Sequence, residues 1–161
     1  MVKSKKVYAK LIIAGCLLIF VLTGCFLFYI GHSAAASAAA ALKSETGISL
    51  SGDSRLLYAH SKHDFFGEGT HVFVWQLTEE DFAKTAVWMP LPIPREYREQ
   101  LEKLNAGQFD GKMELHGSSG WYSIRTGPDS WDGKEAFAGE NLTLLVADEG
   151  NGKLYMAELQ K

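Results

Sequence analysis

The sequence has few of the residues and motifs on which small exported domains and enzymes commonly rely. Its two cysteines, Cys16 and Cys25, both precede residue 31, so residues 31–161 cannot form a disulfide among themselves. No Ser-x-x-Lys, no Gly-x-Ser-x-Gly and no glycine-rich phosphate-binding motif occurs. Their absence excludes the commonest signatures of a serine nucleophile and of nucleotide binding. The sequence therefore predicts no catalytic residues and no cofactor, and it favours a protein that is not an enzyme.

Charge is absent from residues 11–30, LIIAGCLLIFVLTGCFLFYI. As a helix, a stretch of this length extends over about 30 Å, the thickness of the hydrocarbon core of a bilayer. Four lysines lie just before this stretch, Lys3, Lys5, Lys6 and Lys10, and no Lys or Arg follows it until Lys43. Because basic residues favour the cytoplasmic side, we expect a single-pass transmembrane helix over residues 11–30. Residues 1–10 would lie in the cytoplasm, and residues 31–161 would lie outside the cell membrane.

The same stretch allows a second interpretation. Leu22-Thr23-Gly24-Cys25 resembles the lipobox of bacterial lipoproteins, which implies a signal that ends at residue 24 and a lipid on Cys25. Residues 26–30 are apolar and depart from that pattern, because lipoproteins usually continue with small polar residues. Both the uncleaved anchor and lipidation at Cys25 leave the same domain on the same side of the membrane, and the sequence leaves the two open.

The chain beyond the anchor is acidic and long enough for one domain. It carries 12 basic and 19 acidic residues, a net charge of −7 with histidine neutral, which argues against nucleic acid as a partner. Residues 31–47 are Ala-rich and offer no apolar face large enough to pack, so we expect a stalk there. Residues 48–161 then form one extracytoplasmic domain with its own hydrophobic core.

Apolar periodicity and turn residues predict an α+β domain with a small, mainly antiparallel sheet and two short helices. Thr78 is expected to cap the first helix. Tyr97, Leu101 and Leu104 give the second helix an apolar stripe. The expected strands are 55–60, 70–77, 112–116, 121–125, 142–149 and 153–160, and the expected helices are 78–85 and 95–106.

The last two strands flank Asn151-Gly152, which predicts a hairpin with a two-residue turn. Such a turn places Val146 opposite Ala157. Because side chains alternate along a strand, one face then collects the apolar residues that we expect in the core: Leu142, Leu144, Val146, Tyr155, Ala157 and Leu159.

Three histidines, His60, His63 and His71, crowd the expected hairpin of the first two strands. Imidazole is a common ligand of zinc and other transition metals, so these residues are candidate metal ligands, although their spacing matches no known metal motif. The alternative is a polar loop with solvated histidines. A metal-dependent or acid–base hydrolase that uses this loop is the rival to a binding module.

Trp131 lies in a loop that is rich in Gly, Pro and Asp, residues 126–139. An exposed Trp can anchor a protein interface or stack on a sugar, so Trp131 is a candidate binding residue. The alternative is a Trp that folds back over the sheet.

Two segments resemble a group of small, uncharacterised, membrane-attached outer proteins of Gram-positive bacteria. They are residues 63–69, which lead into the strand 70–77, and the closing hairpin, residues 142–159. The resemblance implies location and fold class, and it assigns no activity. We therefore expect a membrane-anchored extracytoplasmic binding module of the bacterial cell envelope, whose partner is another envelope protein or a cell-wall component. An immunity-type protein is a further alternative.

Overall fold

The computed structural model describes the backbone of residues 2–63, 69–126 and 141–160, and their side chains except those of residues 2–14, 27–32 and 63. The chain divides into two compact units, Met1–Ser37 and Ala38–Lys161. Helix α1, Val2–Thr46, supplies the first unit and the beginning of the second.

Residues 11–30 lie wholly within α1, so the prediction that this stretch is one helix is confirmed. The side chains described in it include Leu17, Phe20 and Phe26, and these are all largely exposed. Across the part of the chain that the structure describes, no helix is both long and apolar enough to cross a membrane.

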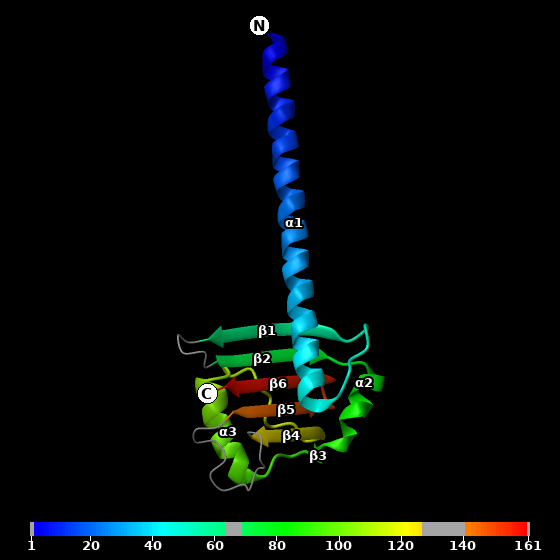
Figure 1. Ribbon diagram of the computed structural model, residues 1–161, viewed down its shortest axis with the longest axis vertical. Coiled ribbons are helices and arrows are strands. Elements are labelled where there is room, and N and C mark those ends of the chain that lie inside the picture. The colour runs from blue at the N-terminus through cyan, green and yellow to red at the C-terminus, as the bar shows by residue number, and fades with distance from the viewer. Residues whose placement is uncertain (1, 64–68, 127–140, 161) are drawn as a thin grey trace. The chain divides into compact units, whose positions relative to one another are not determined.

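The second unit is built on one antiparallel sheet of six strands, and the α+β class is confirmed (Figure 1). The strands lie in the order β1-β2-β6-β5-β4-β3. Four helices occur in the described chain, one more than the three that the sequence predicted with the anchor helix included. The elements after α1 are β1 Arg55–His63, β2 Gly69–Gln76, α2 Glu79–Ala83, η1 Lys84–Val87, β3 Met89–Pro90, α3 Arg95–Gly107, β4 Gly120–Thr126, β5 Leu142–Asp148 and β6 Lys153–Gln160.

Helix α3 covers one face of this sheet. Its side chains Tyr97, Leu101 and Leu104 pack on the buried apolar side chains of that face, and Leu101 is fully buried. This packing confirms the predicted apolar stripe. The face beneath it holds all six residues that the sequence assigned to the core face of β5 and β6. We call this the α3 face; its strand residues are Val72, Val74, Tyr122, Ile124, Leu142, Leu144, Val146, Tyr155, Ala157 and Leu159.

The end of α1 covers the opposite face, where the sequence predicted only a stalk. Ala38 and Leu42 are each 0 % exposed and pack against β2, β5 and β6. The stalk interpretation is therefore wrong for these residues: small side chains let the helix approach the sheet closely, and Leu42 fills the space. We call this the α1 face; its buried strand residues are Phe73, Trp75, Leu145, Ala147, Leu154 and Met156.

A buried carboxylate fastens the segment after α1 to helix α2. Thr78 caps α2 by accepting a hydrogen bond from the backbone N–H of Asp81, as predicted. The Asp81 side chain accepts hydrogen bonds from Ser51 and Ser54, and it pairs with Lys84. Burial alone would raise the pKa of Asp81, but Lys84 and these hydrogen bonds outweigh it and hold the pKa well below its usual range.

The closing hairpin has a different register from the predicted one. Asp148 pairs with Lys153, and Val146 pairs with Tyr155 instead of Ala157, so four residues, 149–152, form the turn. Gly152 has a positive φ of 65°, whereas the predicted turn needs positive φ at Asn151 as well. The Asp148 side chain instead accepts a hydrogen bond from the Gly150 N–H, and the Asn151 side chain accepts one from the Lys153 N–H at the start of β6. A shift of two residues leaves every side chain on its predicted face.

The predicted strand 112–116 is also wrong. Met113 and Leu115 are buried in the cluster under α3, but the backbone there pairs with a side chain instead of a strand. The Asn105 side chain donates to the Met113 carbonyl at 2.8 Å and accepts from the Met113 N–H at 3.0 Å. The sixth strand is instead β3, whose residues Met89 and Pro90 pair with Tyr122 and Trp121.

Candidate functional site

A row of polar residues crosses the α1 face at one end of the sheet. Arg125 of β4 pairs with Thr143 of β5, Thr143 pairs with Glu158 of β6, and Glu158 pairs with His71 of β2. Directly paired residues of antiparallel strands point to the same side. The row therefore continues the apolar stripe of this face, and the face changes from apolar to polar along the strands.

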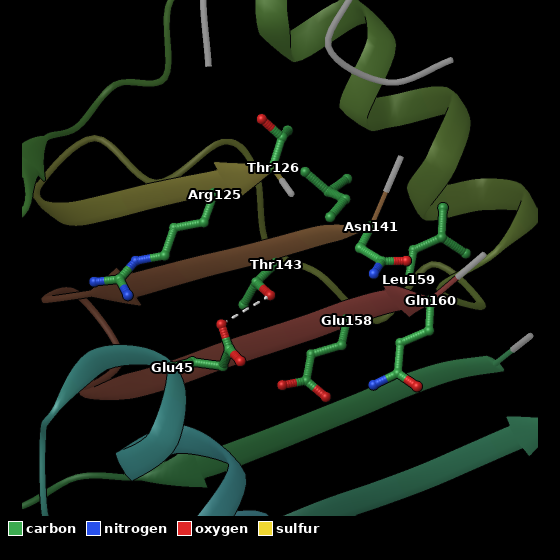
Figure 2. Close-up of a pocket in the computed structure, with 9 residues that line it drawn as sticks. Glu45, Arg125, Thr126, Asn141, Thr143, Glu158, Leu159 and Gln160 are labelled. Carbon is green, nitrogen blue, oxygen red and sulfur yellow. Dashed lines mark hydrogen bonds between the residues drawn. The ribbon is translucent and has the colours of Figure 1, made fainter. Parts of the chain in front are cut away.

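A pocket of about 380 Å³ opens over this row, which is a volume typical of small-ligand sites. Figure 2 shows Glu45, Thr143, Glu158 and Arg125 around it. Glu45 comes from the last turn of α1, so the helix that covers the apolar part of this face also supplies one wall of the pocket. The lining residues are Glu45, Arg125, Thr126, Asn141, Leu142, Thr143, Glu158, Leu159 and Gln160.

Glu158 is the unusual member of the lining. Its side chain is only 9 % exposed, and among the described residues it has neither a hydrogen-bond donor nor a basic partner within ion-pair distance. Burial raises the pKa of the Glu158 carboxyl, and repulsion from Glu45 raises it further. Buried carboxylates are normally paired or hydrogen-bonded, so this one lowers the stability of the empty fold.

The other charged groups of the pocket do not relieve Glu158. The Glu45 carboxylate accepts a hydrogen bond from the Thr143 hydroxyl at 3.4 Å, which holds a second negative charge beside the pocket. Arg125 is exposed and forms no ion pair within the described chain, although it lines the same pocket. The arrangement offers acceptors to a cation that is not part of the protein.

The structure does not bring the predicted metal ligands together. His60 pairs with Val72 and His71 pairs with Ser61, so His60 and His71 point to opposite faces of the sheet. His60 lies 3.8 Å from Asp110, beyond the α3 face. His63 is the last residue of β1, and its side chain is outside the described part. No group of three or more His, Cys, Asp or Glu side chains that could hold a metal ion is found among the described residues.

A serine and a histidine do meet on the α1 face. The Ser61 Oγ lies 2.9 Å from the His71 Nδ1. His71 in turn pairs with Glu158 of the neighbouring strand β6. The order of these groups is similar to that of a serine hydrolase triad. Neither Ser61 nor His71 lines the pocket, however, so nothing in the described chain places a substrate carbonyl beside Ser61.

Two predicted sites depend on residues outside this face. Trp131 lies outside the described residues, so its role as a binding residue stays a prediction. Cys25 is exposed in the first unit, and its lipidation also stays a prediction.

Sequence reasoning did not identify Glu45, Glu158 or Arg125. A signal was present in β6, whose sequence KLYMAELQ has Leu154 and Met156 on the face opposite the one that the hairpin prediction assigned to the core. Apolar residues at these positions indicate that the second face is also covered. Glu158 then stands out as a carboxylate at the end of a buried stripe.

In comparisons with known proteins, no family model, no curated protein and no solved structure matches this chain. The resemblance of residues 63–77 and 142–159 to small membrane-attached outer proteins of Gram-positive bacteria therefore remains a prediction.

Proposed function

We propose that the protein is a non-enzymatic binding module, anchored in the cell membrane through residues 11–30, and that the pocket beside Glu158 is its ligand site. The observation that carries the ligand site is the buried and unpaired carboxylate of Glu158 in a pocket of about 380 Å³. Folding alone does not require such a group, since burying it without a partner lowers stability. A ligand that supplies a positive charge removes that cost when it binds.

The anchor is supported by the sequence and by the state of the side chains in α1. Residues 11–30 carry no charge, and large apolar side chains described there are exposed, such as Phe20 at 79 %. Exposed apolar surface of this extent is unfavourable in water and favourable among acyl chains. The lysines before residue 11 favour the outer side for the domain, and we propose that its partner there is an envelope protein or a cell-wall component.

Two experiments test this proposal separately. A tag fused after Lys161 should be cut by protease added to whole cells, and protection until lysis would contradict the outer location.

For the pocket, a photo-crosslinking residue at Thr143 should capture a partner in cells, and the capture should be lost on Glu158→Gln. The same crosslinker at Glu80 is the matched control, because the Glu80 side chain is 81 % exposed in α2 and does not line the pocket. Equal capture at both positions would contradict the pocket as the binding site.

Mass spectrometry of the membrane-extracted protein distinguishes the two modes of anchoring. An intact Met1 terminus is expected for the transmembrane helix. A chain that begins with a lipid-modified Cys25 would show that the protein is a lipoprotein.

The hydrolase remains the second candidate because Ser61 Oγ and His71 Nδ1 are 2.9 Å apart. Labelling of Ser61 by a fluorophosphonate, abolished by His71→Ala, would favour it over the binding module. The immunity-type alternative also stays a prediction.

A further inference from the structure

The charges of the pocket define the ligand more closely than the pocket alone does. Glu158 projects from β6 and Glu45 from α1, so two carboxylates from different elements face one cavity. Each has free lone pairs, because within the described chain Glu45 receives one hydrogen bond, from Thr143, and Glu158 receives none. The mutual repulsion of the two groups is strongest when the pocket is empty.

A small group that carries positive charge and several N–H donors fits this arrangement. An ammonium group has three donors around a compact charge, enough to reach two carboxylates and a third acceptor such as the Thr143 hydroxyl oxygen. A metal ion fits less well, because no three His, Cys, Asp or Glu side chains converge anywhere in the described chain. Arg125 at the edge of the pocket repels a polybasic segment, which favours a single ammonium group.

We propose that the pocket binds a primary ammonium group, such as that of a lysine side chain, between the carboxylates of Glu158 and Glu45. This inference rests on the proposed function, since it names the chemical class of the ligand for the same pocket. The ammonium group neutralises the repulsion between the carboxylates and gives Glu158 the partner that it lacks. The end of α1 thereby becomes part of the binding site through Glu45.

The test uses the full chain, labelled with ¹⁵N, in micelles of an uncharged maltoside detergent at constant ionic strength. The probe is n-butylammonium, and n-butanol is the neutral compound of similar shape. n-Butylammonium should cause saturable shifts of the Thr143 and Glu158 amide signals, whereas n-butanol should not. Glu158→Gln should weaken the binding at least tenfold. Arg125→Gln, which removes a positive charge from the lining and keeps both carboxylates, should tighten the binding.

Several results would overturn the inference. They are the absence of saturable shifts, equal shifts with n-butanol, tighter binding of calcium alone at the same amides, and an unchanged affinity in Glu158→Gln. Exposed Glu149 supplies a control, because Glu149→Gln should keep the affinity of the wild type. If n-butylammonium fails while crosslinking from Thr143 still depends on Glu158, the ligand class is wrong and the binding site stands. If both fail, the proposed function falls as well.

Discussion

The two faces of the sheet differ although the same strands supply both. The α3 face is apolar in its centre, and at the end where the α1 face carries charges it has Leu142 and Leu159 paired with the uncharged Thr126 and Thr70. The α1 face is equally buried in its centre but ends in the row formed by Arg125, Thr143, Glu158 and His71. The first face is explained by folding alone. The polar end of the second face needs a further explanation, and the pocket provides it.

The largest expected effects test whether both faces of the sheet belong to the hydrophobic core. Leu144 and Leu145 are neighbours in β5, point to opposite faces and are each 0 % exposed. Leu144→Ala and Leu145→Ala should each lower the free energy of unfolding by about 2–5 kcal/mol, because each leaves a cavity. Thermal unfolding followed by tryptophan fluorescence measures both. A loss below about 1 kcal/mol in Leu145→Ala alone would show that the end of α1 does not cover its face.

The next effect concerns the fastening of α2 beside the α1 face. Asp81→Asn should cost about 2 kcal/mol at pH 7, because it removes a buried charged acceptor of the hydrogen bonds from Ser51 and Ser54 and the partner of the half-exposed Lys84. The pKa of Asp81 is lowered in the folded state, so its contribution is complete above the ordinary value of about 4 and is lost as the pH falls through the lowered value.

Urea unfolding at pH 7 and at acidic pH measures this dependence. The difference between wild type and Asp81→Asn should narrow as the pH decreases. Glu80→Gln is the control, since Glu80 lies 3.8 Å from the same Lys84 but is exposed and should change stability by less than about 0.5 kcal/mol. A difference that does not depend on pH would contradict the lowered pKa.

A smaller effect of opposite sign is expected at the polar end of the α1 face. The pKa of Glu158 is raised in the folded state, so its ionisation destabilises the fold as the pH rises above the unfolded value of about 4.3. Glu158→Gln should therefore stabilise the protein by about 1 kcal/mol at neutral pH. This gain should disappear under acidic conditions, and Glu149→Gln should show none. A loss of stability at pH 7 would mean that Glu158 has a structural role.

The smallest effect is expected at the far end of the same row. Ser61→Ala removes an exposed hydrogen bond to His71 and should change stability by about 0.5 kcal/mol or less. The affinity for n-butylammonium should stay the same, because Ser61 does not line the pocket. A loss of affinity for n-butylammonium would show that the binding site reaches Ser61, and it would favour the hydrolase over the binding module.

Local patterns predicted much of this fold. The apolar stripe of α3, the cap of α2 by Thr78 and the core face of the closing hairpin follow from periodicity and side-chain chemistry, and the structure confirms them. The turn at 149–152 and the segment around Met113 were mispredicted because side chains supply hydrogen bonds that the patterns assign to backbone. Asn105 and Met113 illustrate the difficulty, since a strand-like sequence was bound by an amide eight residues earlier.

The candidate site was harder to predict than the fold. Glu45, Glu158 and Arg125 are far apart in the sequence, and none of them belongs to a recognisable motif. Histidine spacing suggested the hairpin of β1 and β2 instead, but strand alternation separates His60 from His71. A spacing argument locates residues along one element, whereas this pocket depends on which strands are neighbours.

The sequence by itself determined the continuous helix through residues 11–30, the α+β class and the core-facing side of β5 and β6, because helix propensity and side-chain alternation act over a few residues. Only the tertiary structure decided that the end of α1 is core, that the sheet is buried on both faces, and that Glu45 meets Glu158. These outcomes depend on the strand order and on the packing of a distant helix. Such contacts join residues that are far apart in the chain, so no periodicity of the sequence reveals them.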